Sequence, residues 1–129
     1  MYETRAGEPS IRLFSIVIDC KDANALADFY AAVLGWRKYT DDPEWIAVGK
    51  QGISPFLIFQ EEPGYRPPVW PDNPDDQQKS IHLDFAVSDR KTAVQHALDC
   101  GATMASPQFS DQWIVMIDPA GHPFCLCER

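Results

Sequence analysis

The chain has 129 residues, 45% of them apolar, which is enough for one packed core and short for two independent domains. Nineteen acidic and eleven basic residues give a formal net charge of −8, which repels nucleic-acid phosphates and anionic lipid surfaces. We find no apolar run near the ~20 residues of a spanning helix and no hydrophobic signal core at the start. We therefore expect a cytoplasmic protein that binds neither nucleic acid nor membranes.

The first half of the sequence predicts a β-α-β-β-β unit. Residues 1–10 form a polar arm, and residues 11–20 are rich in β-formers. Asp22 is placed to cap a helix over Ala23–Leu34, whose apolar residues recur at helical spacing, and Gly35 ends it. Three strands are then predicted, near 36–39, 45–48 and 55–60.

A Pro-rich segment follows, over residues 61–80. It holds five of the eleven prolines, which exclude a helix interior or a central strand. Loops of about twenty residues inside a compact domain are usually functional or mobile. Tyr65 and Trp70 are large aromatics that favour burial, so we expect both to fold back as a lid over a cleft.

The second half predicts the same order of elements. A strand over 81–87 precedes Asp89, a helix over Arg90–Cys100 and a terminating Gly101. The strands that complete it are expected near 103–105, 113–117 and 124–128.

Two segments of the first half reappear 68 positions later. Trp45–Val48 returns as Trp113–Met116, and Pro55–Gln60 as Pro123–Glu128. Each unit is too small to bury its own apolar face, so two copies predict one pseudo-symmetric body with a shared cleft. The fold class is therefore α+β, a single domain over 1–129 with modules 11–60 and 81–128 joined by the linker 61–80.

Short motifs add a family resemblance. Phe29-Tyr30, Leu34-Gly35-Trp36 and the late run Asp118-Pro119-Ala120-Gly121-His122-Pro123-Phe124 resemble the glyoxalase/bleomycin resistance/extradiol dioxygenase (vicinal oxygen chelate) superfamily, in its glyoxalase-like branch. The resemblance implies that each module curls its four strands into half of an open barrel, with the helices outside. In metal-dependent relatives the ligands lie on the first and last strands, and these positions fall here on Ser15, Leu57, His82 and Cys125.

Only His82 matches the His, Gln or Glu usual at those positions. A catalytic metal needs about three protein ligands, so no cofactor is predicted; a divalent metal held by His82 with other ligands is the alternative. Strand alternation independently turns His82, Asp84 and Asp19 into the cleft. His82 with Asp84 is either an acid–base pair or a structural remnant.

The remaining candidates would contact a ligand through apolar surface. Aromatic walls are the usual lining of small-molecule pockets, although the same residues could instead seal module or dimer contacts. The four cysteines form no CxxC pair, which favours free thiols, and Cys125 is interpreted as inert rather than as a nucleophile or soft ligand. The residues proposed to line the cleft are Phe59, Tyr65, Trp70, Trp113, Cys125 and Asp19.

The function predicted from these features is binding of a small organic molecule in a central cleft by a bleomycin-resistance-like protein. The alternative is a lyase, isomerase or dioxygenase that uses His82, since one scaffold supports many activities. Exposed aromatics also predict a homodimer.

Overall fold

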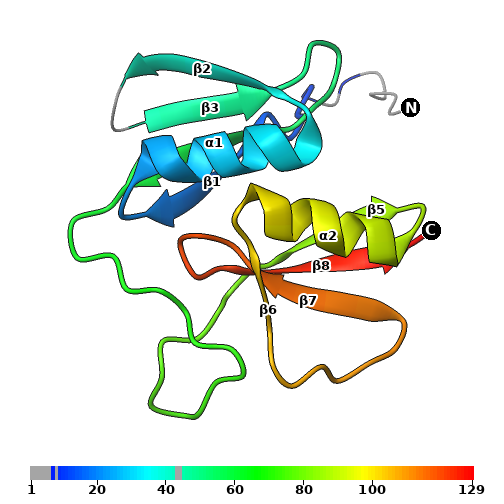
Figure 1. Cartoon of the computed structure of the whole chain (residues 1–129). Helices are drawn as coiled ribbons and strands as arrows, with labels where there is room; N and C mark the ends of the chain where they lie inside the picture. Colours follow the sequence, from blue (N-terminus) through cyan, green and yellow to red (C-terminus); the bar gives the residue numbers. More distant parts are fainter. Residues whose placement is uncertain (1–6, 8, 43–44) are drawn as a thin grey trace.

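The computed structural model describes residues 7, 9–42 and 45–129. Two β-α-β-β-β modules follow one another along the chain (Figure 1). Module one contains β1 (Ser15–Cys20), α1 (Ala23–Leu34), β2 (Arg37–Asp42), β3 (Trp45–Gly49) and β4 (Phe56–Glu61). Module two contains β5 (Leu83–Val87), α2 (Arg90–Cys100), β6 (Thr103–Met104), β7 (Trp113–Ile117) and β8 (Pro123–Glu128).

Both helices lie where the sequence predicted them, but only α1 has its expected side-chain cap, because within the described residues Asp89 makes no capping hydrogen bond at the start of α2. The Asp22 side chain accepts a hydrogen bond from the Ala25 N–H at 3.0 Å. Gly35 ends α1 and Gly101 ends α2, both with the positive φ that glycine tolerates best. Neither helix of the described chain is long and apolar enough to cross a membrane.

Each module forms its own four-stranded mixed sheet. The strand orders are β1-β4-β3-β2 and β5-β8-β7-β6, with β1 parallel to β4 and β5 parallel to β8. The first strand of each module therefore lies at a sheet edge. The two sheets do not close into a barrel, which confirms the α+β class with an open arrangement.

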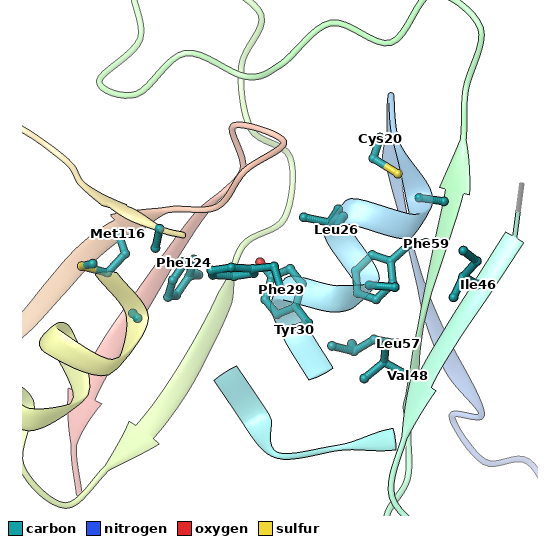
Figure 2. Close-up of a cluster of buried hydrophobic side chains, with 14 of the residues drawn as sticks. Cys20, Leu26, Phe29, Tyr30, Ile46, Val48, Leu57, Phe59, Met116 and Phe124 are labelled. Atoms are coloured by element: carbon teal, nitrogen blue, oxygen red, sulfur yellow. The ribbon is translucent and has the colours of Figure 1, made fainter. Parts of the chain in front are cut away.

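Each helix covers one face of its own sheet, and we call the opposite face the inner face. The two helices pack against each other (Figure 1), and one apolar core contains side chains of both modules (Figure 2). Tyr30 of α1 stacks on Phe59 with ring centroids 5.4 Å apart and meets Phe124 of module two edge-on at 6.2 Å (Figure 2). These aromatic contacts join the modules through apolar burial.

The position expected for Phe59 was wrong. Phe59 is fully buried in the core beneath α1 and does not face inward. In module one Val48 pairs with Leu57, whereas in module two Met116 pairs with Phe124, so the second hairpin is one residue shorter. The last strands are consequently related by 67 positions and not by 68, which turns Leu57 and Phe59 toward the helix and Ile58 inward.

The carboxylates that end the last strands show the same relation. Glu61 accepts a hydrogen bond from the first helical N–H of α1, Ala23, at 3.0 Å. Glu128 accepts one from Arg90, the first residue of α2, at 3.2 Å. Glu128 lies 67 positions after Glu61, and Arg90 lies 67 positions after Ala23. The two modules therefore attach helix to sheet in the same way.

Candidate functional site

A cavity of about 500 Å³ lies along the edge of β1, between the two modules. We call it the central cavity. Its walls come from β1, from the connection between β4 and β5 and from the start of β8, which are well separated in sequence (Figure 1). Its polar side chains include those of Asp19, Tyr30, Tyr65, His82 and His122.

One wall of this cavity is built on a buried carboxylate. Asp118 is 4% exposed and accepts a hydrogen bond from the Tyr30 hydroxyl at 2.7 Å. Its second oxygen accepts from the backbone N–H groups of Ala120 and His122, at 2.8 and 3.0 Å. Burial raises the pKa of Asp118 above its usual range, while the Tyr30 hydrogen bond opposes that rise. The carboxylate therefore fixes the turn before β8 to α1.

The same turn holds the linker and β1. The Tyr65 hydroxyl donates to the Ala120 carbonyl at 2.8 Å, and burial raises the pKa of Tyr65. His122 Nε2 lies 2.7 Å from the Asp19 carbonyl, so this nitrogen carries the proton and donates it. Three segments of the chain thus converge on the turn that follows β7.

A second cluster lies on the inner face of module two. Asp84 pairs directly with Cys125 across the parallel β5/β8 ladder, and His82 lies two residues before Asp84. His82 Nε2 is 3.3 Å from Asp84 Oδ1, and one ligand atom from each of the three residues lies within 4.8 Å of the others. Burial, followed by the Asp84 charge, raises the pKa of Cys125 to about 11. The free thiol is therefore protonated near neutral pH and a poor nucleophile.

Trp70, from the linker, covers the Cys125 side of this cluster. Its indole packs on the small group formed by Ala105, Val115 and Cys125. The Lys79 ammonium lies 4.6 Å from the centroid of the indole ring. The indole Nε1 is buried and has no hydrogen-bond partner among the described residues. Trp70 and Tyr65 therefore cover different places, the inner face of module two and the central cavity.

The structure brings most of the proposed residues together. Asp19, Tyr65 and His82 line the central cavity, with Asp84, Cys125 and Trp70 beside it. Trp113 instead lines a separate hollow with Arg90 and Asp111. The sequence interpretation did not include Tyr30 or His122 in the cavity wall. The sequence feature that could have indicated them is the motif around Asp118, because a buried carboxylate needs hydrogen-bond donors.

The donor chemistry does not fit the cross-module metal site of metal-dependent relatives. Ser15 and His82 hold equivalent places 67 positions apart, as do Ile58 and Cys125. Ile58 offers no lone pair and Ser15 only a weak neutral one, so module one supplies no adequate ligand. The sequence had placed this ligand position at Leu57, and neither Leu57 nor Ile58 can bind a metal.

The sequence matches the family described as Glyoxalase-like domain over residues 15–127. The chain belongs to this family. Solved structures of low sequence identity share its fold. No curated protein sequence matches it.

Three of these solved structures illustrate the range. A glyoxalase/bleomycin resistance protein/dioxygenase family enzyme from Burkholderia phytofirmans is 16% identical, with a TM-score of 0.67 over 92% of this chain and 98% of the other. An antibiotic-binding protein from a Streptomyces species is 17% identical, with a TM-score of 0.62 over 94% and 98%. The trypanothione-dependent glyoxalase I of Leishmania major is 21% identical, with a TM-score of 0.64 over 92% and 87%.

Proposed function

We propose that the protein binds a small organic molecule in the central cavity and does so without the cross-module metal. The observation that carries this proposal is the cavity itself. Its volume of about 500 Å³ lies within the range of roughly 300–1,000 Å³ typical of small-molecule sites. It combines apolar surface from β1 with a few polar groups that converge from three segments.

The polar groups are suited to orienting an uncharged or weakly charged ligand. The side chain of His82 is 38% exposed, so its imidazole can donate or accept a hydrogen bond in the cavity. Tyr65 contributes an aromatic ring to the same cavity, where it lies next to the imidazole of His122. The Streptomyces neighbour supports the proposal by analogy, because it is an antibiotic-binding protein on the same fold.

The linker provides the closing element in this proposal. Pro67, Pro68 and Pro71 restrict the backbone around Trp70, which reduces the entropy lost when the loop orders over a ligand. The buried indole Nε1 has no partner in the described part of the chain, so a movement of Trp70 that brought it to an acceptor on the ligand would be favoured. The lid thus consists of Tyr65 over the cavity and Trp70 at its margin.

A ligand screen with matched variants tests the proposal. Metabolites and aromatic antibiotics are screened by thermal shift, and hits are measured by calorimetry. We expect Tyr65→Ala, Trp70→Ala and His82→Ala each to weaken binding about tenfold or more, a change of about 1.4 kcal/mol. His96→Ala on the exposed face of α2 is the matched control and should bind normally. Equal affinity in all four variants, or a screen without hits, would refute binding in this cavity.

Acid–base catalysis is the second candidate function. It is favoured by the 3.3 Å contact between His82 and Asp84, in which the carboxylate can orient the imidazole for proton transfer. Incubating each hit with the protein and analysing the products by mass spectrometry separates the two functions. Unchanged compounds favour binding. Turnover lost in His82→Ala and reduced in Asp84→Asn, with an altered pH profile, favours an enzyme.

A further inference from the structure

We propose that module two alone carries a site for a thiophilic divalent cation, of the zinc or cadmium class, made by His82, Asp84 and Cys125. This site differs from the cross-module metal site, which module one cannot complete. It also goes beyond the proposed function, because a cation can bind these three side chains with no organic molecule in the central cavity.

The separation of the three donor atoms suits a cation. All lie within 4.8 Å of one another, and His82 Nε2 and Asp84 Oδ1 are already 3.3 Å apart. Ligand atoms around tetrahedral zinc lie about 3.5 Å apart, given metal–ligand bonds of about 2.0–2.3 Å. Closing the widest gap takes about 1 Å of movement. The exposed His82 and Asp84 side chains can supply it by rotation.

The sheet holds the ligands in register. Asp84 and Cys125 face each other on two hydrogen-bonded strands, and His82, one residue before β5, has its donor atom within 4.8 Å of theirs. Cys125 is 6% exposed and packed under Trp70, so its sulfur has a fixed position toward which the other two donors can move. Ligands on rigid strands lose little entropy when a cation binds.

The identity of the donors sets the class of cation. One imidazole nitrogen, one carboxylate oxygen and one thiolate sulfur form a mixed set that suits zinc and cadmium, whereas magnesium and manganese prefer oxygen ligands. Three protein ligands also leave one position open, as in catalytic zinc sites. His82 lines the central cavity, so the site lies at the margin of that cavity.

One nearby charge acts against cation binding. The Lys79 ammonium lies over the Trp70 ring, and Trp70 in turn packs on the group that includes Cys125. The ammonium is engaged with the indole face, and the negative charges of Asp84 and a bound thiolate exceed its single positive charge. Lys79→Gln should therefore raise the affinity for the cation.

Titration of the chelator-treated full chain with cobalt(II) tests the site. A thiolate bound to cobalt gives charge-transfer absorption in the near ultraviolet, and zinc should displace it while magnesium should not. We expect Cys125→Ser to abolish this absorption, and His82→Ala and Asp84→Asn to weaken cobalt binding about tenfold or more. Cys127→Ser, on the same strand and facing the same way, and His96→Ala are the matched controls and should keep it.

The opposite results overturn the proposal. Cobalt binding without the sulfur absorption, absorption that survives Cys125→Ser, or absorption lost in Cys127→Ser would each show that these three residues do not form the site. His82 and Asp84 are exposed, so their variants report binding even if Cys125→Ser fails to fold. Binding of the organic hits to the chelator-treated protein tests the proposed function without the cation. The two proposals can therefore fail independently.

Discussion

Replacing Tyr30 by phenylalanine tests the contact that joins the modules at the cavity wall. The substitution removes the hydroxyl that donates to Asp118 at 2.7 Å and keeps the ring that stacks on Phe59. A hydrogen bond to a buried charged group contributes about 1.5–3 kcal/mol, and its loss leaves the carboxylate one donor short. We expect Tyr30→Phe to lower the free energy of unfolding by about 2 kcal/mol, or the melting temperature by roughly 6–10 °C.

The size of this loss should depend on pH, and the sign follows from the pKa of Asp118. Burial raises this pKa in the folded protein, so the protonated carboxyl favours folding. That stabilisation is complete below the ordinary pKa of about 4 and is lost as the pH rises through the folded value. Tyr30→Phe removes the hydrogen bond that lowers the pKa, so its cost should be smallest near pH 4 and largest near pH 7.

Urea unfolding followed by tryptophan fluorescence measures these differences. Wild type, Tyr30→Phe, Asp118→Asn and the double variant form a cycle, measured at about pH 4 and about pH 7. The asparagine oxygen can still accept from the backbone, and its amide can donate to the Tyr30 hydroxyl. Additive losses in the cycle, or a Tyr30→Phe cost that does not change with pH, would refute the reasoning.

Three further predictions concern the core, the linker and the assembly. Phe59→Ala should lower the free energy of unfolding by about 3–5 kcal/mol in urea titration, because the ring is fully buried; a cost below about 1 kcal/mol would place it outside the core. Trp70→Ala should speed alkylation of Cys125 by iodoacetamide, followed by mass spectrometry, because the burial that raises this thiol pKa to about 11 is reduced; an unchanged rate would contradict the packing. Light scattering at micromolar concentration should show a homodimer, since Val17 and Trp45 are large apolar side chains left 48% and 44% exposed; a single 14.5 kDa species would exclude it.

The helices could be predicted from sequence because their signals are local. Asp22 precedes an apolar stripe with helical spacing, and Gly35 and Gly101 mark the helix ends. Caps and glycines act within one turn of the chain and need no distant partner.

The inward face of β4 could not be predicted in the same way. Phe56, Leu57, Ile58 and Phe59 are consecutive apolar residues, so the strand has no alternation that marks its two faces. The one-residue difference between the hairpins then decides the orientation, and that difference lies in turns of different sequence. The place of Trp70 and the Tyr30–Asp118 contact depend on residues far apart in the chain, which no local pattern specifies.

Because of the turn after β7, the two modules differ in how much sequence change their corresponding loops can tolerate. In module one the corresponding loop bonds within its own half, where the Ser54 hydroxyl donates to the Leu13 carbonyl. In module two the loop holds Tyr30 and the Asp19 carbonyl of the other half. Insertions and substitutions should therefore be tolerated in the first loop and selected against in the second. The two modules are similar in fold, yet the loop of module one can vary while the loop of module two must keep the contacts that join the modules.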